Sequence, residues 1–199
     1  MRFGRMVAAF VALSASTPLA QGSGSTPEWI EYTDRTDRFT INLPHQPTIR
    51  ETMYPPQRGQ PVPARVYTVD DGPRRYSVTV VNLATIREPS DIKGSVAWEA
   101  WNFRKRGGEI SYDAYAQVDR IEGHQLHITN PDKTVSFVGI YVHARRLYIL
   151  EARVPPSTPG ALQFQQSLFI LDEQGQRIRY DLDADGNRLR RITNLDGIC

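Results

Sequence analysis

The sequence predicts an α+β fold: a mostly antiparallel β-sheet covered by one long and one short helix, with a C-terminal β-hairpin extension. Two observations predict this class. Most of the chain consists of short segments with the two-residue alternation of β-strands, and the links between them are too short for parallel crossovers. Only two stretches have helical spacing, and a sheet of the seven or eight strands expected here needs such a cover.

The strands follow from alternation and turn signals. "RFTINL" (38–43) alternates apolar and polar residues, which predicts a half-buried strand. "ARVYTVDDGPRRYSVTVV" (64–81) contains two strands around Asp71-Gly72-Pro73, where Gly and Pro favour a tight reversal. "TVSFVGIYVHARRLYILEARV" (134–154) has β-branched and aromatic residues on both alternations, so we expect central strands covered on both faces.

The long helix is expected over residues 90–106. Ser90 can cap its start, the basic residues 104–106 suit the C-terminal end of the dipole, and Gly107 and Gly108 end it. The short helix is "GALQFQQSL" (160–168), after a proline-rich break. The apolar stripe of the long helix consists of Ile92, Val96, Ala100 and Phe103.

The first 22 residues have the layout of a secretory signal peptide. Arg2 and Arg5 precede an apolar run from Met6 to Ala15, and small residues follow up to Gly22. The run is shorter than the roughly 20 residues that span a bilayer. We therefore expect a periplasmic or secreted protein with no transmembrane segment after signal removal; the alternative is a retained N-terminal anchor. A flexible lead (23–27), an α+β domain (28–172) and a C-terminal hairpin and tail (173–199) would follow.

Charge and cysteine content limit the partners. Removing residues 1–22 takes away two of 24 basic residues and none of 22 acidic ones, which leaves a formally neutral chain. A nucleic-acid-binding protein would be expected to keep a basic excess, so we expect no nucleic-acid partner. Cys199 is the single cysteine, and an internal disulfide is therefore excluded.

The order of aromatic and proline landmarks resembles a known family. "EWIEYTDRTDRFTINLPHQP" (28–47), a strand pair, a helix, "RRLYILEARVPP" (145–156) and "FQQSL" (164–168) are similar to small exported bacterial proteins with an α/β/α sandwich like that of PsbP, the photosystem II extrinsic subunit. The resemblance covers residues 28–172 in pattern and implies a binding or assembly module. It carries no catalytic motif, so no site residue is transferred from it.

"DLDADGNRLRR" (181–191) begins like a calcium loop. Asp181, Asp183 and Asp185 are the candidate metal ligands, but the last ligand position of an EF-hand holds Ile192 in place of glutamate. "LDEQGQRIR" (171–179) repeats the same pattern without the alternating acids, which favours a polar turn over a cation site. The stretch also resembles a single YD-type repeat of the RHS proteins, in which this spacing marks hairpin turns.

Other candidate sites are isolated. His124 and His127 lie three residues apart on an expected strand, which points them to opposite faces and argues against a shared metal. No nucleophile motif frames any serine, and no catalytic residue or cofactor is expected. Trp98 lies on the wrong face of the long helix, where it either packs under a loop or contacts a partner.

Cys199 is the candidate redox residue. The terminal carboxylate beside it should raise its thiol pKa, which argues against a nucleophile. An unpaired thiol in an oxidising compartment predicts a minor disulfide-linked dimer or a mixed disulfide; a buried or reduced thiol is the alternative.

The sequence thus favours an exported, non-catalytic binding or assembly module for an unknown protein or envelope component. A small periplasmic hydrolase and a calcium-stabilised secreted protein are the alternatives.

Overall fold

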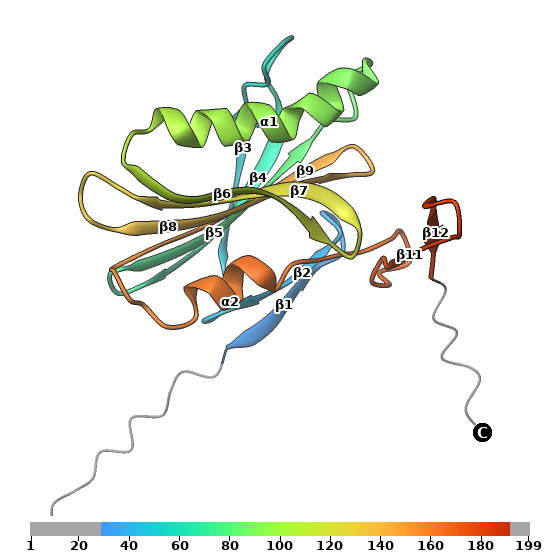
Figure 1. The fold of residues 1–199 in the computed structure, drawn as a ribbon. Coiled ribbons are helices and arrows are strands. Elements are labelled where there is room, and N and C mark those ends of the chain that lie inside the picture. Colours follow the sequence, from blue (N-terminus) through green and yellow to red (C-terminus); the bar gives the residue numbers. More distant parts are fainter. Residues whose placement is uncertain (1–28, 192–199) are drawn as a thin grey trace, which may run out of the picture.

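A computed structural model describes residues 29–191, which form three layers (Figure 1). Helix α1 (Pro89–Lys105) covers one face of a seven-stranded sheet. A three-stranded sheet and helix α2 (Ala161–Gln166) cover the other face. The predicted signal peptide (1–22), the predicted lead (23–27) and Cys199 lie outside the described residues.

The large sheet is antiparallel throughout, in the order β3-β4-β5-β9-β8-β7-β6. Its strands are β3 (Thr48–Tyr54), β4 (Val62–Asp71), β5 (Arg74–Asn82), β6 (Glu109–Val118), β7 (Ile121–Thr129), β8 (Val135–His143) and β9 (Arg146–Val154). Strand β9 occupies the centre and β8 lies beside it, as their continuous apolar sequence predicts. Strands β3 and β6 form the two edges.

The small sheet has the order β1-β2-β10, with antiparallel pairing throughout. Its strands are β1 (Ile30–Asp34), β2 (Phe39–Leu43) and β10 (Phe169–Ile170). The expectation of a half-buried β2 is wrong, because Thr40 is buried together with its apolar neighbours. The Thr40 and Thr33 hydroxyls lie 3.0 Å apart and hydrogen-bond, which satisfies the buried polar group.

A C-terminal hairpin of β11 (Tyr180–Leu182) and β12 (Arg188–Arg190) follows the small sheet. The Arg188 guanidinium donates to the carbonyl of Arg120 and forms an ion pair with Glu122 at the start of β7. The structure has twelve strands between residues 29 and 191, more than the seven or eight expected. Of the short ones, β11 and β12 form the expected C-terminal hairpin, and β10 has two residues, too few to show alternation.

Helix α1 has the predicted apolar stripe. Ala100 and Phe103 are buried against the large sheet, and Ile92 and Val96 pack at its margin. The predicted Ser90 cap is wrong: Glu88 occupies the N-cap position without a side-chain cap, and Pro89 begins the helix. At the first helical position the N–H that Pro89 lacks would have no intrahelical acceptor, and the fixed φ of proline suits this position.

Two apolar clusters fill the spaces between the layers. The cluster under α1 includes Phe103, Leu126 and Ile140, and the cluster on the opposite face is rich in aromatic residues such as Phe39 and Tyr76. Between residues 29 and 191, no helix is long and apolar enough to cross a membrane.

Candidate functional site

A cleft of about 720 Å³ lies between α1 and the β6–β7 hairpin. It is larger than the cleft of about 400 Å³ beside β3 and the groove of about 330 Å³ beside α2. Its apolar lining comes from both the helix and the sheet: Val96, Ala97, Ala100 and Val142. Its polar lining is Lys93, Arg104, Tyr115, Gln117, Glu122 and His124. A concave, mostly apolar surface with a few convergent polar groups is typical of ligand sites.

Three polar side chains meet at one end of this cleft. Arg104, in the last turn of α1, donates from Nε and Nη2 to the two carboxylate oxygens of Asp113 on β6, both at 2.7 Å. His124 on β7 places Nε2 2.5 Å from Asp113 Oδ1 and 3.2 Å from Arg104 Nη2. One carboxylate therefore holds a guanidinium and an imidazole in fixed orientations, and the cluster joins α1 to the hairpin.

The electrostatics of the cluster follow from this geometry. The Arg104 guanidinium, together with the hydrogen bond from His124, holds the pKa of Asp113 at about 2, below its usual 3.8. Asp113 is therefore ionised at neutral pH and compensates Arg104. Lys93, on the same wall of the cleft, forms no ion pair with any residue between 29 and 191. A cation thus remains available to a ligand.

The cluster has two of the three parts of a hydrolytic triad. Asp113 can orient His124 as a carboxylate does in such triads, but no serine, threonine or cysteine is among the residues that line the cleft. A base without a neighbouring nucleophile supports hydrogen bonding to a ligand more directly than covalent catalysis.

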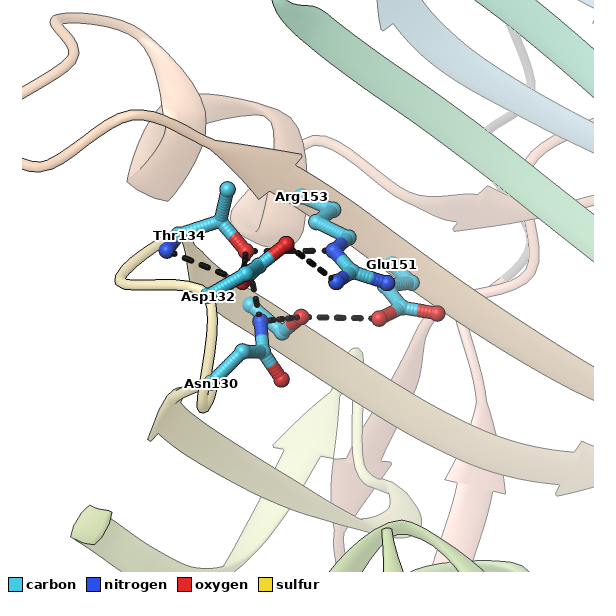
Figure 2. A network of polar contacts seen from close by, with 6 residues as sticks. Asn130, Asp132, Thr134, Glu151 and Arg153 are labelled. Atoms are coloured by element: carbon cyan, nitrogen blue, oxygen red, sulfur yellow. Dashed lines mark hydrogen bonds and ion pairs between the residues drawn. The ribbon is translucent and has the colours of Figure 1, made fainter. Parts of the chain in front are cut away.

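A second polar network lies at the β7–β8 turn (Figure 2). Ser136 is buried, accepts a hydrogen bond from Asn130 Nδ2 at 2.9 Å and donates to Glu151 Oε1 at 2.8 Å. Arg106, just after α1, pairs with the other oxygen of Glu151 at 2.9 Å. Every hydrogen-bonding atom of the Ser136 hydroxyl is thus used within the protein, and the network fastens the end of α1 to the sheet.

The turn at the periphery of this network is held from the next strand. Arg153 donates to the Asp132 carboxylate at 2.7 Å and to the Thr134 hydroxyl at 3.1 Å (Figure 2). These contacts stabilise the turn, and none of the network's residues lines the clefts described above, so we assign the network a structural role.

The candidate metal ligands lie on the C-terminal hairpin. Asp183 accepts backbone hydrogen bonds from Asp185 at 3.0 Å and from Asn187 at 2.7 Å, and the Asp181 carboxylate pairs with Arg191. These contacts are those of a polar turn, with Gly186 at φ 81°. No group of three metal-ligating side chains is found between residues 29 and 191.

Trp98 is half-buried on α1 and stacks on Trp101, with ring centroids 4.8 Å apart. Its indole Nε1 is shielded from solvent and has no hydrogen-bond partner among the described residues. Trp101 is 43% exposed and lies under the ammonium group of Lys105, 4.0 Å from the ring centroid. The more exposed aromatic of this helix face is therefore Trp101, which the sequence analysis did not single out.

The two neighbouring histidines lie on opposite faces of β7, as predicted. His124 faces the cleft under α1, whereas His127 Nε2 lies 3.0 Å from Gln165 Oε1 of α2 and stacks on Tyr112. The sequence analysis missed the partnership of His124 with Asp113. The β6–β7 register pairs Tyr115 with His124, which puts Asp113 diagonally opposite, and this register follows once the turn at 119–120 is recognised.

Comparisons with solved structures find chains that resemble this one. The chain is similar to the solution structure of cyanobacterial PsbP (CyanoP) from Synechocystis sp. PCC 6803, with 11% sequence identity, a TM-score of 0.48, and coverage of 77% of this chain and 99% of that chain. That protein belongs to the family that the sequence resembles, but at this identity and TM-score no function is transferred. No protein-family model and no curated protein matches the chain, so the resemblance to a YD-type repeat has no support.

Proposed function

We propose that the protein is an exported, non-catalytic binding or assembly module and that its ligand site is the cleft between α1 and the β6–β7 hairpin. The observation that carries this proposal is the combination of an apolar wall with a fixed Arg104–Asp113–His124 cluster at one end. Export rests on the N-terminal segment, whose charged start and apolar run are those of a signal peptide.

The lining defines the kind of ligand. Val96 and Ala100 offer an apolar surface, and Lys93 offers a cation without an intramolecular counter-ion among residues 29–191. Tyr115 is 93% exposed at the rim and can stack on a flat or apolar group. We therefore propose a ligand that is partly apolar and carries an anionic or acceptor group, such as an acidic peptide segment of an envelope protein.

The Asp113–His124 pair favours a hydrolase as the second candidate. Hydrolysis would require a nucleophile or an activated water beside His124, and a water molecule can reach the cleft because it is open to solvent. Hydrolysis of a broad ester or amide panel that disappears in His124→Ala and persists in His127→Ala would support this candidate over the binding module.

Site-specific photocrosslinking tests the binding proposal. A benzophenone amino acid at position 97 lies on the cleft wall, and the same group at Ile49 on β3 lies at the far edge of the sheet as the matched control. Irradiation of the exported protein in the intact envelope should give an adduct of defined mass from position 97 alone. Lys93→Ala should reduce its yield. Equal adducts at both positions, or no adduct at position 97, would contradict the proposal.

A further inference from the structure

Strand β6 leaves one sheet edge open. Between residues 29 and 191 it pairs only with β7, so the backbone groups on its outer side have no strand partner. Monomeric proteins usually protect such an edge with lysine, proline or inward-pointing charges. Residues 112–118 contain no lysine, arginine or proline, and their single charge, Asp113, is already compensated by Arg104.

We propose that two copies of this chain pair through β6 in an antiparallel, two-fold symmetric arrangement centred on Tyr115. The two seven-stranded sheets would then form one continuous sheet across the dimer. The pairing uses the edge of the sheet, whereas the cleft opens on its α1 face. Tyr115 and Gln117 belong to both surfaces, so self-association is measured without ligand and is scored separately from ligand binding.

The position of the centre follows from the regular part of β6. The pairing of β6 with β7 is irregular between Ile110 and Tyr112, so the bulge-free ladder runs over residues 112–118. Its midpoint is Tyr115. A two-fold axis at this residue pairs the whole regular segment with its copy and puts residues of the same sheet face opposite each other.

The resulting contacts are complementary on both faces. On the α2 face, Tyr112 lies opposite Val118 of the second copy, and Ala114 lies opposite Ala116. On the α1 face, Asp113 lies opposite Gln117, which can donate a hydrogen bond, and Tyr115 lies opposite its own copy. Tyr115 is 93% exposed, so the pairing would cover an aromatic surface that the single chain leaves in water.

Other symmetric registers are worse. A centre on Asp113 places this carboxylate opposite itself, and a centre on Ala116 places it opposite Asp119, so both juxtapose like charges. A centre on Ala114 draws the bulged residue Ser111 into the ladder and leaves a shorter regular segment.

Strand β3, at the opposite edge of the sheet, is protected against the same kind of self-pairing. The midpoint of β3 is Glu51, which is 83% exposed at its side chain and would face its own copy in the equivalent arrangement. Arg50, beside it, is also exposed. The side chains that would face each other across the two-fold axis therefore favour pairing at β6 and disfavour it at β3. Strand β3 serves as the control surface.

The assay is sedimentation velocity of the exported full chain carrying Cys199→Ser, over a wide range of concentrations. We expect a reversible dimer. Gln117→Arg should lower the dissociation constant of the dimer about tenfold, and Gln117→Glu should raise it about tenfold. Every dimer contains two pairs of residue 117 with Asp113, and each pair changes the dissociation constant a few-fold. A monomer at all concentrations, or equal effects of the two substitutions, would overturn the proposal.

Crosslinking tests the register directly. Directly opposite residues of antiparallel strands have Cα atoms about 4.5–5.5 Å apart, within the range of a disulfide. In the Cys199→Ser background, Tyr115→Cys should form a homodimer on mild oxidation, whereas Glu51→Cys, at the equivalent midpoint of β3, should not. A dimer from Glu51→Cys alone, or a different protein crosslinked to Tyr115→Cys in place of a second copy, would refute the self-pairing.

Discussion

Replacing Asp113 with asparagine should lower the free energy of unfolding at neutral pH by about 1–2 kcal/mol. Arg104 and His124 hold the pKa of Asp113 at about 2, against 3.8 without them. At 1.36 kcal/mol for each pKa unit, this difference corresponds to roughly 2.4 kcal/mol, and solvent screening at a side chain that is 29% exposed reduces it. Asparagine keeps the shape of the side chain but loses the charge that both partners contact.

The pH dependence identifies the cause. Because the folded pKa of Asp113 is depressed, its stabilisation is complete above about pH 4 and is lost as the pH falls towards 2. Urea unfolding from pH 7 to pH 2 should therefore show a difference between the wild type and Asp113→Asn that closes in this interval.

Asp70→Asn is the matched control, since Asp70 pairs with Arg75 at a site where both side chains are about 60% exposed. We expect a change below about 0.5 kcal/mol there. An unchanged free energy of unfolding in Asp113→Asn at pH 7, or a difference that persists at pH 2, would refute the assigned role of the cluster.

Three further predictions follow from the side chains that the sequence singled out. Trp98→Ala should cost about 1–3 kcal/mol of stability in thermal unfolding and leave a captured ligand bound, whereas Trp101→Ala, at an exposed ring, should cost less than about 1 kcal/mol; the reverse order would make Trp98 a contact residue. Millimolar calcium should leave the melting temperature unchanged, because Asp183 is engaged by backbone donors; a rise that disappears in Asp183→Ala plus Asp185→Ala would contradict this. If the protein is exported as proposed, its non-reducing electrophoresis should show a minor disulfide-linked species that disappears in Cys199→Ser; a wholly monomeric, alkylation-resistant thiol would contradict an accessible Cys199.

Local patterns predicted the fold class. The apolar residues on both faces of β8 and β9, the Gly72 turn between β4 and β5, and the apolar stripe of α1 are each encoded within about 20 residues, and all three have the predicted form in the structure. The prediction of a Ser90 cap was wrong because Pro89 and Ser90 are both residues that favour a helix start, and the helix begins at Pro89. The strand β10 escaped prediction because two residues cannot show a period, whereas the hairpin of β11 and β12 was expected from its polar turn.

The sequence by itself determined the helices and the strongly patterned strands, because these depend on neighbours in the chain. It also determined that Cys199 has no internal disulfide partner, because it is the single cysteine. Only the tertiary structure decided the candidate site. Arg104, Asp113 and His124 come from three elements and meet because α1 packs across the β6–β7 hairpin. The open edge of β6 likewise depends on the strand order. A strand has unpaired backbone groups on one side only when it is the last strand of the sheet, and the sequence does not reveal which strand is last.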